Sequence, residues 1–184
     1  GFRLGLERNG HNCVAFADIG DAQKRAYKAM YDTKNEVEWG DVSNVNDEEF
    51  RKFKGEVDII CGGFPCQAFS NAGRRRGFED SRGTVFFEIC RAVRAIEPKW
   101  LFFENVKGLL NHDGGRTFLT IVNTLDELGY DVEWQLINSK HHGSAQNRER
   151  VYIIGHRRPR RNKPIFPISK TTDGVLKSVQ ADTS

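Results

Sequence analysis

Apolar residues are spaced along this chain with two periods, one typical of strands and one typical of helices. Short apolar runs predict strands at residues 12–18, 36–42, 57–63 and 99–105. Apolar residues that recur every three or four positions predict helices at residues 1–10, 22–31, 47–55, 84–96 and 116–129. Asp21 is expected to cap the second of these helices. Strands that alternate with helices are typical of a parallel sheet, so we expect a doubly wound α/β fold.

The last two predicted strands break this alternation. Residues 130–138 and 148–155 both have strand-like patterns and are separated only by residues 139–147. That segment is too short for a crossover helix, so the two strands should run antiparallel. We therefore expect a mostly parallel sheet with an antiparallel strand near the end of the chain.

The composition is that of a folded domain. The chain has 184 residues, of which 38% are hydrophobic, and its formal net charge is +3. A charge this mild does not by itself indicate nucleic-acid binding, and each of the basic runs at residues 74–76 and 157–163 is typical of a solvated surface. No apolar run approaches the about 18 residues of a membrane helix, and no signal peptide is visible. We therefore expect a cytoplasmic protein.

The four cysteines fall into two groups. Three lie inside apolar segments and are expected to be thiols packed in the core, namely Cys13, Cys61 and Cys90. There is no C-x-x-C pair and no zinc-ligand spacing among the histidines, so we expect neither disulfides nor a metal. Cys66 differs because it follows two glycines and the stiff Phe64–Pro65 pair. This turn could hold the Cys66 thiol at the mouth of a crevice, where it could react. Alternatively, Cys66 could be a packed thiol that happens to follow a turn.

Polar residues gather where the predicted strands end. Ligands of a doubly wound sheet bind at the carboxyl ends of its parallel strands. The residues at those ends are Asp18, Asp41, Cys66, Glu104 and Asn105. The antiparallel strand should begin at the same edge and bring Gln146, Arg148 and Arg150 with it. Because Arg148 and Arg150 are two positions apart, both should face one side of the strand while Glu149 faces the other.

Each of these residues also has a purely structural explanation. Asp18 could cap a loop, and Asp41 could belong to a turn. Glu104 could form a structural ion pair with an arginine, because a carboxylate after an apolar strand needs a partner. Arg148 and Arg150 could form surface salt bridges. If the set does converge, the two cations would favour the Cys66 thiolate, and Glu104 could act as a general acid if burial keeps it protonated.

Five blocks of sequence, in order and with matching spacing, resemble one enzyme family. They are GDVSNV, GGFPCQAFSNAG, SRGTVFFEICRAV, FFENVKGLL and QNRERVYIIG. The opening GFRLGLERNG is similar to the residues after the first half of that family's cofactor glycine loop. Over about residues 1–157 the chain closely resembles the cytosine-C5 DNA methyltransferases of the bacterial restriction-modification type. The resemblance implies a Rossmann-like fold that uses S-adenosyl-L-methionine, and methylation of C5 of cytosine in double-stranded DNA at a specific sequence.

The resemblance also implies catalytic roles. Cys66 would attack C6 of a cytosine that has been flipped out of the duplex, and Glu104 would contact N3 and assist its protonation. Arg150 would hold the base carbonyl oxygen, while Arg148 would orient the site and a nearby phosphate. Residues 74–76 would lie over the DNA phosphates. The substrate-binding residues implied are Phe64, Gln67, Ser70, Asn105, Val106, Arg148 and Arg150.

The cofactor-binding residues come from the same resemblance. Asp18 would bind the ribose hydroxyls, Ile19 would lie against the adenine face, and Asp41 would accept from the adenine amino group. The other positions implied to line the cofactor are Phe2, Pro65 and Val85.

Three departures from the family pattern leave alternatives open. The leading part of the cofactor loop is absent before Gly1, and Ser144–Ala145 replaces a hydrophobic-Pro pair. In addition, only residues 168–184 remain where the family's target-recognition region and last two motifs should follow. We expect residues 1–157 to form the catalytic domain and 158–184 to be a basic linker and the beginning of a target-recognition region. A complementing polypeptide could supply the rest. The chain could instead be a non-catalytic subunit or fragment, or a tRNA cytosine-C5 methyltransferase, and as a bacterial DNA enzyme it would associate with the nucleoid.

Overall fold

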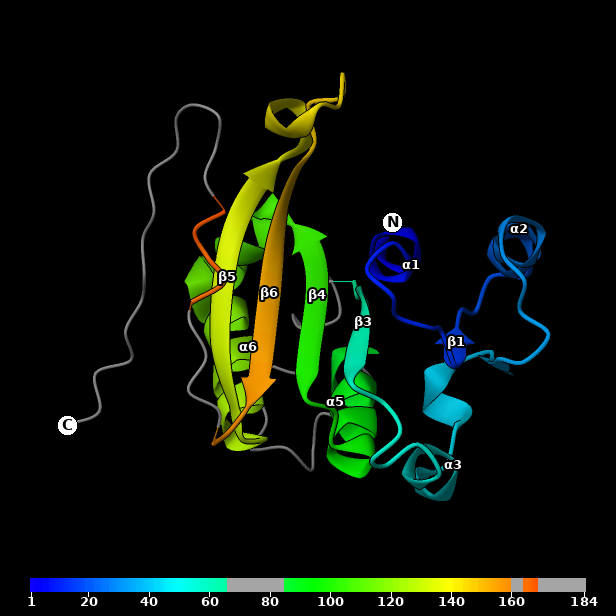
Figure 1. Ribbon diagram of the computed structural model, residues 1–184. Coiled ribbons are helices and arrows are strands. Elements are labelled where there is room, and N and C mark those ends of the chain that lie inside the picture. Colours follow the sequence, from blue (N-terminus) through cyan, green and yellow to red (C-terminus); the bar gives the residue numbers. More distant parts are fainter. Residues whose placement is uncertain (66–84, 160–163, 169–184) are drawn as a thin grey trace.

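A four-stranded sheet forms the centre of the protein. The computed structural model describes residues 1–65, 85–159 and 164–168. The strand order is β3 (Ile59–Gly63), β4 (Trp100–Val106), β6 (Glu149–Arg157) and β5 (Tyr130–Asn138). β3 is parallel to β4, and β6 is antiparallel to both of its neighbours, so β5 runs parallel to β4 (Figure 1). The expected antiparallel pairing of the last two strands is confirmed, and β6 lies between β4 and β5.

Two further strands form a separate parallel pair. β1 (Ala15–Ala17) pairs with β2 (Val37–Trp39), and Ala17 lies opposite Trp39 in the register. Both strands are short, and their side chains are partly or fully exposed. The parallel pairs β1–β2 and β3–β4 each place their carboxyl ends at one edge, as the alternation of strands and helices predicted.

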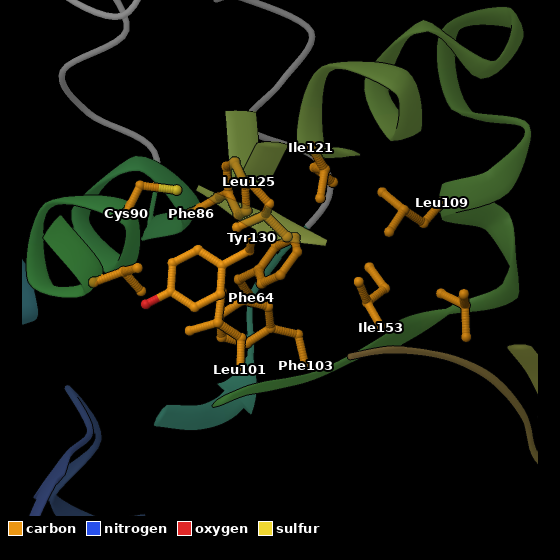
Figure 2. Packing of buried hydrophobic residues seen from close by; sticks show 12 residues of the cluster. Phe64, Phe86, Cys90, Leu101, Phe103, Leu109, Ile121, Leu125, Tyr130 and Ile153 are labelled. Atoms are coloured by element: carbon orange, nitrogen blue, oxygen red, sulfur yellow. The ribbon is translucent and has the colours of Figure 1, made fainter. Parts of the chain in front are cut away.

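Two long helices cover one face of the four-stranded sheet (Figure 1). They are α5 (Val85–Ile96) and α6 (Arg116–Glu127). Figure 2 shows the core between these helices and the sheet, where Phe86, Leu101, Phe103 and Leu125 are almost completely buried. The hydroxyl group of buried Tyr130 donates a hydrogen bond of 2.7 Å to the carbonyl oxygen of Pro98. The polar end of this aromatic side chain is therefore satisfied inside the core.

The shorter helices surround the β1–β2 pair and the ends of the sheet. The α-helices are α1 (Phe2–Glu7), α2 (Asp21–Met30) and α3 (Asp47–Arg51). The 3-10 helices are η1 (Val42–Asn44), η2 (Lys107–Leu110), η3 (His112–Gly115) and η4 (Ser139–His142). The prediction that Asp21 caps α2 is wrong, because Gly20 occupies the N-cap position and Asp21 is already inside the first turn. There its negative charge still complements the positive end of the helix dipole.

A second hydrophobic cluster attaches α3 and β2 to α5. Its buried members are Val45, Phe50, Ala92 and Ile96. The ring of Trp39, the last residue of β2, lies edge-on to Phe50 and to Phe53, with centroid distances of 5.3 Å in both cases. This packing joins the loop that follows β2 to the same helix that supports β3 and β4.

Among the residues that the structure describes, no helix is both long enough and apolar enough to cross a bilayer.

Candidate active site at the carboxyl ends of the strands

Glu104, near the carboxyl end of β4, is ion-paired with both predicted arginines. Its Oε1 atom lies 2.8 Å from Arg150 Nε and 3.4 Å from Arg148 Nη2. The side chains of Glu104 and Arg150 are only 23% and 20% exposed, whereas Arg148 is 47% exposed. The structure therefore brings together three residues that the sequence placed on one edge, and Arg150 is the closer and more enclosed partner.

The strand register explains this arrangement. Arg150 lies opposite Val106 in the β4–β6 pair, and Tyr152 lies opposite Glu104. Residues two apart on a strand share a face, so Glu104 and Arg150 point to the same side of the sheet. Glu149 faces away and forms its own ion pair with Lys107 at 2.9 Å. A one-residue slip of this register would turn both arginines away from the carboxylate.

The segment that leads to Cys66 is anchored to the end of β4. Asn105 is 3% exposed, and its Nδ2 atom donates a hydrogen bond of 2.7 Å to the carbonyl oxygen of Phe64. Its Oδ1 atom accepts a hydrogen bond of 2.8 Å from the backbone N–H of Val106. Gly63 lies opposite Glu104 in the parallel register, and a Cβ on Gly63 would approach the Glu104 carbonyl oxygen to 3.3 Å. The lack of a side chain at Gly63 thus lets β3 end directly beside Glu104.

Phe64 is a core residue in this structure. It is 6% exposed, and its ring centroid lies 5.0 Å from that of Phe86 and 6.1 Å from that of Phe103. The adjacent Pro65 and the first residue of α5, Val85, are exposed. The predicted residues Cys66, Gln67 and Ser70 and the run at 74–76 lie outside the described residues.

The predicted cofactor residues of β1 and β2 lie on neighbouring loops. Asp18 Oδ1 accepts a hydrogen bond of 2.8 Å from Gly20 N, and Asp41 Oδ1 accepts one of 2.9 Å from Ser43 N. Hydrogen bonds from Ser43 hold the pKa of the exposed Asp41 carboxyl below its ordinary value. Both aspartates therefore stabilise local turns, as the structural alternative for these two residues predicted. Their carboxylates nevertheless lie at the carboxyl ends of two paired parallel strands.

Ile19 stands out beside Asp18 because its side chain is exposed. The residue is 77% exposed, although a large aliphatic side chain normally gains free energy by leaving water. Phe2, from α1, packs edge-on against Phe102 of β4 with a centroid distance of 4.8 Å. Since Phe102 and Glu104 are two apart on β4, Phe2 lies on the same side of the sheet as the Glu104 carboxylate.

Two hollows lie beside the four-stranded sheet. One, of about 350 Å³, is on the face that bears Glu104 and is lined by Phe102, Ile137, Ser139, His142, Tyr152, Ile154, Phe166 and Ile168. Tyr152 connects it to the ion-paired group, because it lies directly opposite Glu104. Tyr152 was not among the residues predicted from the sequence, although its alternation with Arg148 and Arg150 was a usable signal. The other hollow, of about 430 Å³, contacts Ile59 and Trp100 at the amino ends of β3 and β4, away from this group.

The three described cysteines are poor candidates for a nucleophile. Burial raises the pKa of the Cys61 thiol to about 11 and also raises that of Cys90. Burial is likewise the largest cause of the raised pKa of Cys13. Thiols of this kind remain protonated near neutral pH and react poorly as nucleophiles. Cys90 is packed in the core as predicted, whereas Cys13 and Cys61 are only partly buried.

Comparison with known proteins places the chain among DNA methyltransferases. It is 46% identical over 158 residues to the type II methyltransferase M.HpaII of Haemophilus parainfluenzae, covering 84% of this chain and 42% of that protein. It is 43% identical over 154 residues to the type II methyltransferase M.HhaI of Haemophilus parahaemolyticus, covering 84% and 45%. The chain thus spans less than half the length of these curated relatives.

Solved structures support the fold class. A putative DNA modification methyltransferase encoded within an Escherichia coli prophage superimposes with a TM-score of 0.64 at 23% identity, over 84% of this chain and 42% of that one. DNMT2 of Spodoptera frugiperda gives a TM-score of 0.65 at 21% identity, over 83% and 45%. The expected Rossmann-like methyltransferase fold is confirmed.

The family assignment follows from the sequence profile. The profile described as C-5 cytosine-specific DNA methylase matches residues 1–182, which is nearly the whole chain. The order of the five blocks and the placement of Glu104 beside Arg148 and Arg150 are in keeping with that match. The chain belongs to the C-5 cytosine-specific DNA methylase family.

Proposed function

We propose that the full natural protein transfers a methyl group from S-adenosyl-L-methionine to C5 of cytosine in double-stranded DNA at a specific sequence. One observation carries the proposal: Glu104, paired with Arg148 and Arg150, lies beside the anchored segment that leads to Cys66. Cys66 follows Phe64 by two positions, so covalent geometry keeps its Cα within about 7 Å of that of Phe64. Cys66 therefore follows closely on the end of β3, and we propose that its thiol faces the acid and the two cations.

The proposed role of Cys66 is nucleophilic. Its thiolate forms a bond to C6 of a flipped-out cytosine, and the electron pair of the C5–C6 bond becomes available at C5. Arg148 and Arg150 supply positive charge that favours the thiolate over the thiol. After C5 has gained the methyl group it loses its proton, and breaking the bond between sulfur and C6 restores the ring.

Glu104 and Arg150 are proposed to exchange partners when the base enters. In the free site Arg150 binds Glu104 Oε1 at 2.8 Å. The base carbonyl oxygen would take over the guanidinium of Arg150, while the carboxyl group of Glu104 would share a proton with N3. A proton at N3 withdraws electrons from the ring and so assists the attack at C6. Arg148, which is more exposed, would also reach a phosphate.

The residues at the ends of β1 and β2 fit the cofactor. Asp18 and Asp41 present carboxylates, the acceptors that ribose hydroxyls and an adenine amino group require. The exposed side chain of Ile19 offers an apolar surface for the adenine ring, and Phe2, Pro65 and Val85 are proposed to line the remainder. When bound, S-adenosyl-L-methionine supplies the methyl group. Phe64 and Asn105 would act by shaping the segment before Cys66, and Gln67, Ser70 and Val106 would contact DNA.

We further propose that residues 1–157 form the catalytic domain and that residues 158–184 are a basic linker and the beginning of a target-recognition region. That region could come from the same protein or from a complementing polypeptide. Binding to DNA would place the protein at the nucleoid.

Methyl transfer tests the proposal directly. The full natural protein is incubated with cofactor carrying a labelled methyl group and with mixed-sequence duplex DNA, with the same DNA containing 5-fluorocytosine, and with tRNA. We expect the labelled methyl group to appear in the DNA. We also expect the protein to form a covalent complex with the fluorinated duplex, because fluorine at C5 blocks the loss of the C5 substituent. Cys66→Ser should abolish both. Label in tRNA alone would favour the tRNA enzyme, and no transfer to any substrate would favour a non-catalytic subunit.

A further inference from the structure

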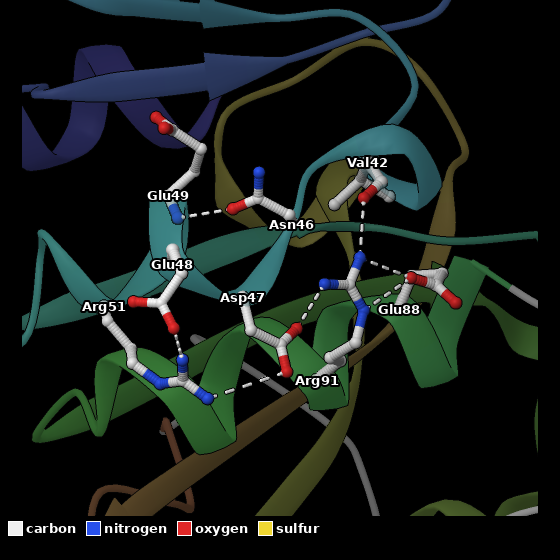
Figure 3. Close-up of polar contacts among 8 residues, drawn as sticks. All are labelled: Val42, Asn46, Asp47, Glu48, Glu49, Arg51, Glu88 and Arg91. Atoms are coloured by element: carbon white, nitrogen blue, oxygen red, sulfur yellow. Dashed lines mark hydrogen bonds and ion pairs between the residues drawn. The ribbon is translucent and has the colours of Figure 1, made fainter.

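Arg91, on α5, connects three segments of the chain (Figure 3). Its Nη1 atom lies 2.6 Å from Asp47 Oδ1 at the start of α3, and its Nε and Nη2 atoms lie 2.9 and 2.8 Å from Glu88 Oε2 on its own helix. Nη2 also donates a hydrogen bond of 3.2 Å to the carbonyl oxygen of Val42. The guanidinium group packs over the Phe50 ring, 5.0 Å from its centroid. Arg91 is thus held on several sides.

The bond to Val42 is the informative one. Asp47 and Glu88 already balance the charge of Arg91, so a bond to a neutral carbonyl is not needed for neutralisation. Val42 directly follows Asp41, the proposed acceptor of the adenine amino group. The Asp41 carboxylate is held on the other side by the backbone N–H of Ser43 at 2.9 Å. The turn at residues 41–43 is therefore fixed both by its own cap and by the guanidinium from α5.

We propose that Arg91 is a positioning residue for the adenine end of the cofactor: it holds the Val42 carbonyl, and through it sets the direction of the Asp41 carboxylate. This inference rests on the proposed function. The same helix also supports the other half of the site, because Phe86 of α5 packs against Phe64, two positions before Cys66. One helix therefore sets the positions of the segment before the nucleophile and of the turn that meets adenine.

The geometry requires arginine at this position. A planar guanidinium can donate to two carboxylates and a carbonyl in fixed directions, whereas the ammonium group of lysine is a compact point charge. Arg91→Lys keeps the charge and most of the length but cannot satisfy Asp47, Glu88 and Val42 together. Arg51 provides a matched control. Its guanidinium group pairs with Glu48 and lies 4.0 Å from Asp47 in the same cluster, but it makes no hydrogen bond to the carbonyl oxygen of Val42.

The experiment measures binding of S-adenosylhomocysteine to the full natural protein by calorimetry. A second ligand carries inosine in place of adenosine, so that it lacks the amino group. We expect Arg91→Lys to weaken binding of the adenosine ligand about tenfold, the factor that corresponds to about 1.4 kcal/mol, and to leave the inosine ligand nearly unchanged. Asp41→Asn should have the same selectivity, and the double variant should be no weaker than Asp41→Asn alone. Arg51→Lys should bind both ligands as the wild type does.

Other outcomes separate the inference from the function on which it rests. The role of Arg91 would be overturned, with cofactor binding left intact, if Arg91→Lys bound the adenosine ligand as tightly as the wild type or lost equal affinity for both ligands. It would also be overturned if the affinity losses of Arg91→Lys and Asp41→Asn multiplied in the double variant. If wild-type protein fails to bind the adenosine ligand, both the role and the proposed function fall. Should Arg91→Lys not fold, Asp47→Asn removes one support of the guanidinium. It should then show a smaller, adenine-selective loss, and a loss without selectivity would refute the proposal.

Discussion

The buried side-chain amide of Asn105 lies 2.7 Å from the carbonyl oxygen of Phe64 and donates a hydrogen bond to it. This bond connects the end of β4 to the residues just beyond β3, which are 41 positions away in sequence. It fixes the backbone at the entrance to the segment that carries Cys66. The carboxylate of Glu104 and the start of that segment are therefore positioned by adjacent residues of one strand.

Replacing Asn105 tests this connection. Asn105→Ala removes the donor of this buried hydrogen bond, and removing one partner of a buried hydrogen bond costs about 1–3 kcal/mol. We expect a corresponding loss in the free energy of unfolding, measured with urea, and a larger fall in kcat for methyl transfer than in cofactor affinity. Asn111→Ala is the control, since Asn111 is exposed at the end of η2. Unchanged stability and turnover in Asn105→Ala would show that the bond has no such role.

The two arginines that pair with Glu104 should differ in importance. Arg150 lies nearer the Oε1 atom than Arg148 does, at 2.8 Å against 3.4 Å, and its side chain is less exposed. Charged hydrogen bonds contribute about 1.5–3 kcal/mol when enclosed and less when water competes. Arg150→Lys should therefore reduce the rate of methyl transfer about 10-fold or more, and Arg148→Lys should reduce it less. The single-turnover rate of methyl transfer at saturating cofactor distinguishes the two variants. A greater loss of rate in Arg148→Lys than in Arg150→Lys would contradict the expected difference between the arginines.

Gly155 in β6 lies where the core has no space for a side chain. A Cβ at this position would approach Leu101 Cδ1 to 3.1 Å and Leu101 Cβ to 3.3 Å. Overpacking a core typically costs about 1–3 kcal/mol, so Gly155→Ala should lower the free energy of unfolding by about that amount. Gly108→Ala, where nothing lies within 4 Å of the added Cβ, should be nearly neutral. Equal urea midpoints for the two variants would show that Leu101 can move aside.

Stability should decrease in alkaline solution because of Cys61. Burial raises the pKa of this thiol from 9.0 to about 11. Between these values the unfolded chain loses the proton while the folded chain keeps it, so the free energy of unfolding falls as pH rises. The contribution of the Cys61 thiol to the free energy of unfolding is complete below pH 9.0 and is lost as the pH approaches about 11. In urea titrations from pH 8 to about 11, Cys61→Ala should show a shallower decline than the wild type, and parallel curves would exclude this cause.

Much of the arrangement around Glu104 could be predicted from strand patterns. The short segment 139–147 required an antiparallel return, and the two-residue spacing of Arg148 and Arg150 required a common face. The contacts of 2.8 and 3.4 Å to Glu104 agree with that reasoning. The resemblance to the family could add roles to these residues, but those roles stay predictions, as does every role assigned to Cys66.

Other features depend on tertiary contacts that a local pattern does not contain. Antiparallel pairing alone does not tell whether β6 lies outside β5 or between β5 and β4, and only the second arrangement brings Arg150 to Glu104. The Phe64–Pro65 pair was expected to stiffen the approach to Cys66, but nothing in that pattern indicated that the ring of Phe64 contributes to the core. Asp21 had the chemistry of an N-cap, but the helix begins one residue earlier than the pattern indicated.

The position of β6 between its two neighbours has a consequence for how this protein can tolerate change. Insertions among residues 140–146 would lengthen a surface turn and leave the paired strands untouched. Inserting one residue between Val151 and Tyr152 would turn Arg148 and Arg150 to the opposite side and expose Val151, which is fully buried. Length variation among natural variants, or in engineered libraries, should therefore be concentrated in the turn and absent from the few residues that follow it.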